Sequence, residues 1–182
     1  MSSIRAVFLD RDGVINEDSP DYITSPDQIH ILPGVHEAIS KLNEAGFLVI
    51  VASNQSGIGR GYMSEATLHE INDKIRDVLR IKGAKIEAFY FCPHTPSQGC
   101  SCRKPKSGLL LRASREYGIN LEESYMVGDK PSDIACGESA GCSTILVLSG
   151  QTRGFDRVSF SMMPDYICLD LNTAADWIIE RP

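Results

Sequence analysis

The sequence predicts an α/β protein with a three-layer, doubly wound (Rossmann-like) parallel sheet. Three observations support this fold class. Short apolar runs such as residues 4–10 and 47–52 recur along the chain, helical patterns separate them, and polar residues follow several of the runs directly. Strands that alternate with helices in this way build parallel sheets covered on both faces. The 182 residues suit one domain of ordinary size, and we see no linker, so a single domain over residues 1–182 is expected.

The individual elements follow from hydrophobic periodicity and from residues that end helices. The predicted strands are residues 4–10, 47–52, 86–91, 125–128, 144–148 and 165–168. The predicted helices are residues 34–45, 65–82, 107–117, 131–140 and 171–179. Gly46 and Gly118 stand where helix C-termini favour glycine, and Pro131 suits a first helical turn. Residues 11–33 form a polar connection long enough to suggest a function, and residues 150–164 are expected to form a mobile loop.

Composition and net charge restrict the kinds of molecule that the protein is expected to bind. The formal net charge is −6, so the overall charge does not favour nucleic acid or an anionic membrane surface. No apolar run reaches 18 residues, and the first five residues lack a signal-peptide core. Six cysteines in a chain of this length do not resemble a secreted disulfide framework. We therefore expect a cytoplasmic protein that binds a small molecule and is a monomer.

The first predicted strand ends in two acidic residues, Asp10 and Asp12. Side chains alternate along an extended backbone, so both carboxylates point to the same side. Two like charges this close are tolerated when a cation lies between them or when their proton affinities differ by design. The alternative is a strand that merely leaves the sheet through a polar turn.

Polar groups also follow three later strands. Ser53 and Asn54 end the second, Arg103 and Lys104 lie in the loop after the third, and Asp129 and Asp133 follow the fourth. The carboxyl ends of strands in a doubly wound sheet share one edge, so these groups can converge. Carboxylate oxygens suit Mg²⁺, whereas lysine and hydroxyl groups suit phosphate oxygens. A site with both predicts phosphoryl transfer.

A cysteine-rich loop at about residues 92–105 predicts a second metal. Cys92, His94, Cys100 and Cys102 offer four ligands in eleven residues. A Cys₃His set with no open position indicates a closed, structural Zn²⁺ site. Such a clip would shorten the effective loop before Lys104 and hold Arg103 and Lys104 in place. The alternative is a loop with free thiols.

Four short motifs together resemble those of the haloacid dehalogenase-like phosphatases. They are Asp10-x-Asp12-Gly13, Ser53-Asn54, Lys104, and Gly128-Asp129-x3-Asp133, in the family's order from residue 4 to about 148. Each is weak alone, but four in order at predicted strand ends are specific. Residues 10–16, 53–61, 92–94 and 102–105 are similar to the branch that contains heptose bisphosphate and histidinol-phosphate phosphatases. The resemblance implies a frame without a separate cap domain, in which loops 17–25, 55–62 and 92–106 shape the pocket.

The resemblance also implies roles for individual residues. Asp10 would be the nucleophile and Asp12 the general acid and base, by way of an aspartyl phosphate. The implied catalytic set is Asp10, Asp12, Ser53, Arg103 and Lys104. The implied Mg²⁺ ligands are the side chains of Asp10 and Asp129 and the backbone carbonyl of Asp12. The implied substrate contacts are Asp10, Arg11, Asp12, Asp18, Ser19, Pro20, Asp21, Ser53, Asn54, Gln55, Ser56, Arg60, Arg103, Lys104 and Lys130.

Three functions are open on the sequence. The resemblance favours Mg²⁺-dependent removal of the 7-phosphate of D-glycero-D-manno-heptose 1,7-bisphosphate, a step toward nucleotide-activated heptose for surface polysaccharide. The second is hydrolysis of histidinol phosphate or another small phosphomonoester. The third is a zinc-stabilised binding module without catalysis, which the full set of Asp10, Asp12, Lys104 and Asp129 argues against. Asp133 has two interpretations: it orients Lys130 or the waters of the metal, or it is a helix N-terminal acid favoured by the dipole.

Overall fold

The computed structural model describes residues 3–150 and 160–181, and its centre is a six-stranded parallel sheet. The strands lie in the order β3-β2-β1-β4-β5-β6. β1 (Ala6–Leu9) is central and pairs with β2 (Leu48–Asn54) on one side and with β4 (Tyr125–Gly128) on the other. The outer strands are β3 (Ala88–Cys92), β5 (Ser143–Val147) and β6 (Tyr166–Cys168). The predicted α/β fold class is confirmed.

The long helices match the predicted segments closely. They are α1 (Val35–Glu44), α3 (Glu65–Ile81), α4 (Gly108–Tyr117), α5 (Pro131–Ala140) and α6 (Leu171–Ile179). Sequence patterns missed the one-turn helix α2 (Ser56–Gly59) and the 3₁₀ turns Pro26–Gln28, Pro96–Gln98 and Leu121–Glu123, which are too short to show a period. Most of the predicted 150–164 loop, residues 151–159, lies outside the described residues.

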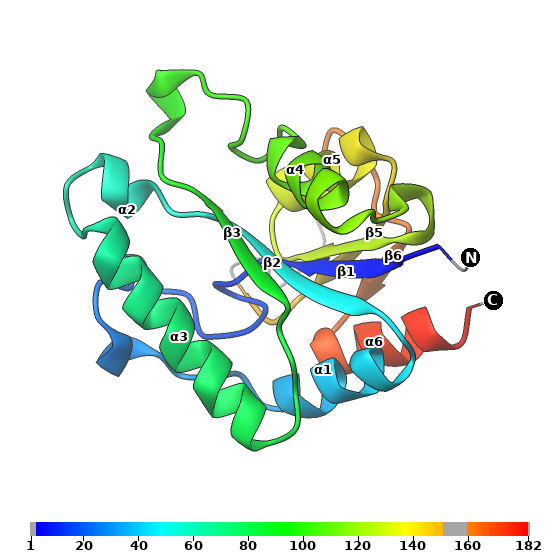
Figure 1. Ribbon diagram of the computed structural model, residues 1–182. Helices are drawn as coiled ribbons and strands as arrows, with labels where there is room; N and C mark the ends of the chain where they lie inside the picture. The colour runs from blue at the N-terminus through cyan, green and yellow to red at the C-terminus, as the bar shows by residue number, and fades with distance from the viewer. Residues whose placement is uncertain (1–2, 151–159, 182) are drawn as a thin grey trace.

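Helices cover both faces of the sheet, as Figure 1 shows: α1, α3 and α6 lie on one face, and α4 and α5 on the other. The central strand supplies both cores, because alternate side chains point to opposite faces. Val7 and Leu9 pack into the core beneath α1, α3 and α6, whereas Ala6 and Phe8 pack toward α4 and α5. All four are fully buried, which explains why the sequence of this strand is a continuous apolar run.

This strand order places a switch point between β1 and β4. The chain leaves β1 toward β2 and β3, and it returns to the other side of β1 with β4. Crevices form beyond the carboxyl ends of strands at such a point. Asp10 follows β1, Asp129 follows β4, and the amide of Asp10 donates to the carbonyl of Val127 (3.0 Å). The two acids are therefore fixed at adjacent strand ends.

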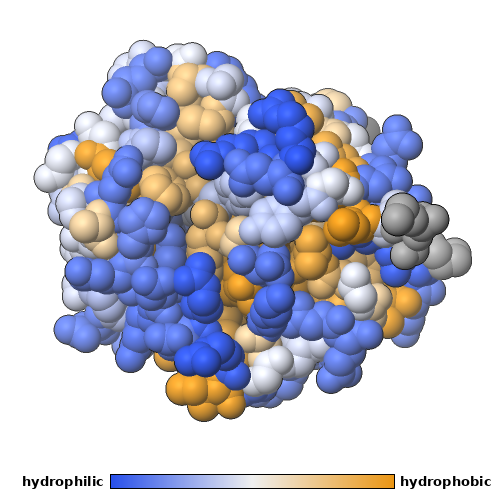
Figure 2. Space-filling view, in the orientation of Figure 1, coloured by the Kyte–Doolittle hydropathy of each residue, from blue (hydrophilic) through white to orange (hydrophobic). Residues whose placement is uncertain are grey.

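Hydrophilic residues dominate the face shown in Figure 2, with smaller hydrophobic patches between them. Among residues 3–150 and 160–181, no helix is both long and apolar enough to span a bilayer.

Candidate active site

Asp10 and Lys104 form the buried centre of the site. Asp10 is 4% exposed and Lys104 is 3% exposed, and the ammonium lies 2.9 Å from Oδ1 of Asp10. The Lys104 ammonium also contacts Oδ1 of Asp133 (2.7 Å) and donates to the carbonyl of Ala52 (2.7 Å). Three acceptors thus compensate the buried cation and aim it at Asp10. The loop after β3 and the end of β1, far apart in sequence, meet here.

Asp133 makes one contact expected of a helix N-terminal acid and a second contact, with Lys104, that neither sequence interpretation predicted. Its Oδ2 accepts the backbone N–H of Lys130 (3.0 Å) at the start of α5, which is the helix-capping interpretation. Its Oδ1 binds the ammonium of Lys104 rather than that of Lys130. A Cβ on Gly128 would lie 2.1 Å from Cβ of Asp133, so a glycine is required for this approach. Asp133 therefore positions Lys104.

Lys130 lies between the two acids that follow β1 and β4. Its ammonium is 3.7 Å from Oδ2 of Asp10 and 3.5 Å from Oδ1 of Asp129, and it is also 3.2 Å from Oδ2 of Asp18. Carboxylate oxygens of Asp10, Asp129 and Asp133 all lie within 4.8 Å of one another. Carboxylate oxygens that follow β1 and β4 therefore lie close to one another and to the Lys130 ammonium.

The charges around Asp10 and Lys104 shift the pKa values of both groups away from their ordinary values. Burial by itself raises the pKa of Asp10, but the ammonium groups of Lys104 and Lys130 lower it below its ordinary value. Burial tends to lower the pKa of Lys104, and the carboxylates of Asp10 and Asp133 raise it above the ordinary lysine value. At neutral pH Asp10 is therefore an anion and Lys104 is a cation.

Asn54 holds the backbone of Lys104 from both sides. The Asn54 side chain donates to the carbonyl of Lys104 (3.1 Å) and accepts the Lys104 N–H (3.0 Å). This pair of bonds ties the end of β2 to the loop that carries Lys104. Asn54 thus anchors this loop, and it also lines the cavity described next.

A cavity of about 330 Å³ lies beside these groups, because Lys130, which contacts Asp10 and Asp129, is part of its lining. Its lining comprises Asp12, Asp18, Ser19, Pro20, Tyr22, Ile23, Asn54, Gln55, Ser56, Arg103, Lys130 and Ser132. Each of the three loops that were predicted to shape a pocket contributes lining residues, and Asp12, Asn54, Lys130 and Ser132 come from outside these loops. Arg103 is braced toward the cavity by a hydrogen bond from its guanidinium to the carbonyl of His94 (3.1 Å).

Several predicted contact residues lie elsewhere. Arg11 is 1% exposed, and its guanidinium binds the carboxylate of Asp12. Asp21 and Arg60 are exposed and do not line the cavity. Ser53 is buried beside Gln55, whose side-chain amide donates to its hydroxyl (2.8 Å). The predicted set thus divides into buried residues, residues that line the cavity, and the exposed Asp21 and Arg60, which do neither.

Sequence reasoning missed Tyr22, Ile23 and Ser132 as lining residues. Tyr22 has φ 64°, a left-handed conformation that is rare outside glycine, and its ring lies 5.3 Å from that of Tyr62. An aromatic residue inside a polar loop was the signal available in the sequence. Its backbone conformation could not be read there.

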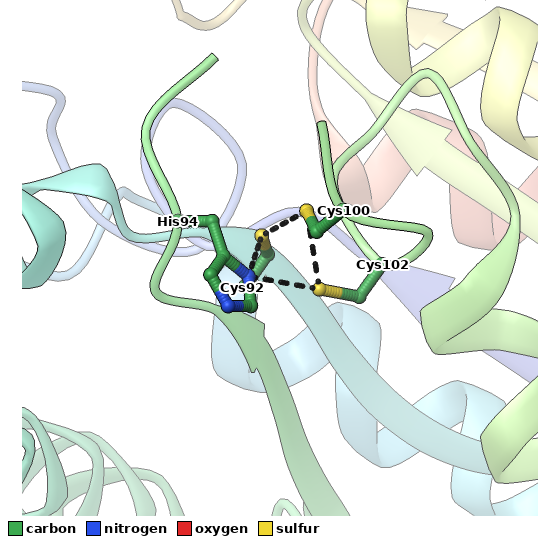
Figure 3. Close-up of side chains that lie close together, drawn as sticks. All are labelled: Cys92, His94, Cys100 and Cys102. Carbon is green, nitrogen blue, oxygen red and sulfur yellow. Dashed lines mark hydrogen bonds between the residues drawn. The ribbon is translucent and has the colours of Figure 1, made fainter. Parts of the chain in front are cut away.

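The cysteine-rich loop gathers its four predicted ligands. Figure 3 shows the side chains of Cys92, His94, Cys100 and Cys102 pointing toward one another. Nδ1 of His94 lies 3.5 Å from Sγ of Cys92 and 3.4 Å from Sγ of Cys102. Sγ of Cys100 lies 3.5 Å from each of the other two sulfurs. The carbonyls of Cys100 and Gly99 accept bonds from Lys106, which closes the loop on itself.

Comparisons with known proteins agree with this geometry. A family model described as HAD-hydrolase-like matches residues 101–174. A Bordetella bronchiseptica protein named D-glycero-beta-D-manno-heptose-1,7-bisphosphate 7-phosphatase is 37% identical over 180 residues, covering 98% of this chain and 99% of the relative. A Thermosynechococcus vestitus protein named D-glycero-D-manno-heptose-1,7-bisphosphate 7-phosphatase is 40% identical over 189 residues, covering 95% and 94%.

A solved structure matches over nearly the whole length. It is D,D-heptose 1,7-bisphosphate phosphatase from B. bronchiseptica complexed with magnesium and phosphate, with a TM-score of 0.88 at 36% identity, covering 97% of this chain and 99% of that chain. The fold and the strand-end site thus define a haloacid dehalogenase-like hydrolase. Within that class, the chain belongs to the D-glycero-D-manno-heptose-1,7-bisphosphate 7-phosphatase family.

Proposed function

We propose that the protein hydrolyses the 7-phosphate ester of D-glycero-D-manno-heptose 1,7-bisphosphate, with Asp10 as nucleophile and Mg²⁺ as cofactor. The observation that carries the proposal is the convergence of Asp10, Lys104 and Asp129 next to a cavity lined by Arg103 and Lys130. Lys104 contacts Asp10, and Lys130 contacts both Asp10 and Asp129. The relatives named for this reaction, which match almost the full chain, support the choice of substrate.

The residues present fit a hard divalent cation. Asp10 and Asp129 supply carboxylate oxygens from adjacent strand ends, which is the donor chemistry that Mg²⁺ prefers. A Cβ at Gly13 would lie 2.5 Å from Oδ2 of Asp129, and one at Gly150 would lie 2.0 Å away, so both glycines make room for this carboxylate. Asp10, Asp129 and the Asp12 carbonyl would hold the ion. Bound there, it would offset the repulsion between the anionic nucleophile and an anionic phosphate.

In the first step, a carboxylate oxygen of Asp10 attacks phosphorus. The bond from phosphorus to the sugar oxygen breaks, and that oxygen takes a proton from the carboxyl group of Asp12. Lys104 and the hydroxyl of Ser53 bind the oxygens of the transferring phosphoryl group. The product is a free sugar alcohol and an acyl phosphate on Asp10.

In the second step, water attacks the phosphorus of the acyl phosphate and gives a proton to the carboxylate of Asp12. Phosphate leaves and the Asp10 carboxylate is restored. Arg103 and Lys130 face the cavity, where their cations suit the second phosphate of a bisphosphate substrate. A monophosphate such as histidinol phosphate would leave those cations without that partner.

The cysteine-rich loop fits a structural Zn²⁺. Tetrahedral coordination with Zn–S bonds of about 2.3 Å places sulfurs about 3.7 Å apart, close to the 3.5 Å seen among these sulfurs. Burial raises the pKa of Cys92 to about 12, so this thiol needs a cation to become a ligand. Cys92, His94, Cys100 and Cys102 would hold the ion, which would fix Arg103 and Lys104, the next residues in the chain.

We place the reaction in the cytoplasm, where thiols stay reduced, and in the supply of nucleotide-activated heptose. The protein is proposed to work as a monomer on a small sugar phosphate, without nucleic acid or membrane.

A substrate panel tests the proposal. Phosphate release is measured with Mg²⁺ for both anomers of the heptose bisphosphate, the heptose 7-monophosphate and histidinol phosphate. We expect kcat/KM for at least one bisphosphate anomer to exceed that for histidinol phosphate by about 10²-fold or more, because two cations meet the second phosphate. Faster turnover of histidinol phosphate would overturn the proposed substrate while leaving the phosphatase chemistry intact.

The glycine beside Asp129 gives a test of the Mg²⁺ site. Gly13 and Gly46 have almost the same φ, 89° and 85°, but a Cβ at Gly46 meets nothing within 4 Å. Both Ala variants should lose about 1–2 kcal/mol of stability from the left-handed backbone. Only Gly13→Ala should also raise the Mg²⁺ concentration for half-maximal activity, by about tenfold or more, since it displaces the Asp129 carboxylate. Equal Mg²⁺ dependence in both variants would remove Asp129 from the site.

A further inference from the structure

Four hydrogen bonds hold the carboxylate of Asp12 in one orientation. Oδ1 accepts from Nε of Arg11 (2.9 Å) and from Nδ2 of Asn16 (2.9 Å). Oδ2 accepts from Nη2 of Arg11 (3.0 Å) and from Nε2 of Gln55 (3.1 Å). Arg11 and Asn16 come from the same turn as Asp12, whereas Gln55 comes from the end of β2. Gln55 is therefore the donor that ties Asp12 to another part of the site.

The same side-chain nitrogen of Gln55 also donates to the hydroxyl of Ser53 (2.8 Å). The donor in both contacts is Nε2, so the nitrogen and not the oxygen of the amide faces Asp12. Both N–H groups are thereby used within the site. Gln55 is 4% exposed, and its backbone N–H donates to the carbonyl of Cys92 (2.8 Å), so the linking side chain stands on a fixed backbone.

We infer that Gln55 is a positioning residue that holds the Asp12 carboxyl group at a fixed distance and orientation from the Ser53 hydroxyl. The inference rests on the proposed function, in which Ser53 binds the transferring phosphoryl group and Asp12 protonates the leaving oxygen. The two hydrogen bonds of Gln55 set the distance between the Ser53 hydroxyl and the Asp12 carboxyl group. Their loss would leave phosphoryl binding in place and misplace the proton donor.

The leaving group reveals whether proton delivery is affected. When the phosphorus–oxygen bond of a sugar phosphate breaks, the departing alkoxide is a strong base and needs the proton of Asp12. The departing aryloxide of p-nitrophenyl phosphate is a weak base and leaves without it. A defect in positioning Asp12 therefore slows the first step selectively for alkyl esters, whereas a defect in phosphoryl binding or in folding slows it for both. This step is read from kcat/KM, because kcat also includes hydrolysis of the acyl phosphate, in which Asp12 is the base for either substrate.

The test compares Gln55→Met with the unaltered protein on a sugar phosphate and on p-nitrophenyl phosphate, both with Mg²⁺. Methionine has a similar length and no donor. We expect kcat/KM for the sugar phosphate to fall by about 10- to 100-fold, part of the 10²–10⁴ that general acid catalysis supplies, and kcat/KM for the aryl phosphate to fall less than about threefold. Gln28→Met is the matched control, because Gln28 is exposed and bonds to Thr24 and Ser25, and the ratio of the two rates should stay unchanged.

Equal losses on both substrates would overturn the inference, and so would unchanged rates on both. If Gln55→Met does not fold, as thermal unfolding will show, Gln55→Leu also lacks a donor, adds no charge beside Asp12 and carries the same comparison. Failure of the proposed substrate is distinguishable: the unaltered protein would then not release phosphate from heptose bisphosphate. The ratio is in that case measured with the alkyl phosphate it hydrolyses best.

Discussion

Asp10→Asn should reduce phosphate release by roughly four orders of magnitude or more, the scale of losing a covalent nucleophile. The amide is nearly the same size as the carboxylate but cannot attack phosphorus or form an acyl phosphate. Lys104 keeps Asp133 and the Ala52 carbonyl as partners, so the buried cation is not left alone. The variant should therefore remain folded. Phosphate release under Mg²⁺ saturation and thermal unfolding measure the two effects.

Asp27→Asn makes the same chemical change at an exposed site near the cavity loops, and it serves as the control. Retained activity in a folded Asp10→Asn protein would reject Asp10 as the nucleophile. An unfolded variant would instead mean that the Asp10 charge is needed to hold Lys104 in the interior.

Cys102→Ser should have the second largest effect. We expect zinc content to fall from about one ion per chain to nearly none. The free energy of unfolding should fall by at least about 3 kcal/mol, a fraction of the ~10–16 kcal/mol that zinc supplies to small zinc peptides. Activity should drop more than about tenfold, because Arg103 and Lys104 follow Cys102 directly and depend on the loop for their positions. Elemental analysis, denaturant unfolding and phosphate release check the three effects.

Cys142→Ser is the matched control for that experiment. Cys142 is buried in the core beneath α4 and α5, and burial raises the pKa of its thiol to about 12. Its replacement should cost about 1–3 kcal/mol for burying a hydroxyl and leave zinc content unchanged. A folded, active protein that contains no zinc when isolated would show that the loop stands without metal and that its thiols are free.

The sheet could be predicted because its determinants are local. The run from Ala6 to Leu9 is apolar on both faces, which only a central strand between two helix layers requires, and Asp10 marks where it ends. The helices show apolar residues every three or four positions, and a glycine follows α1, α3, α4 and α5 within two residues. Such local patterns do not determine the order of the strands, but the polar residues at strand ends indicated that one edge of the sheet carried the chemistry.

The contacts within the site could not be predicted, because they join distant segments of the chain. Nothing near Asp133 indicates that it binds Lys104 rather than Lys130, since the contact joins α5 to the loop after β3. Arg11 reads as a cation next to an active-site acid, and only the fold shows that its side chain is buried against Asp12. From the sequence, Gln55 is likewise only an amide in a loop, and the structure alone shows its hydrogen bonds to Asp12 and Ser53.

The proposed mechanism requires that Asp10 becomes covalently phosphorylated. Its most direct test is a single turnover with radiolabelled substrate and Mg²⁺, stopped in acid on the millisecond scale, followed by proteolysis and mapping of the label. We predict label on the peptide that contains Asp10, transient and matched in rate to phosphate release, and no label in Asp10→Asn. Release of phosphate with no labelled protein at any time, or with label on another residue, would contradict it.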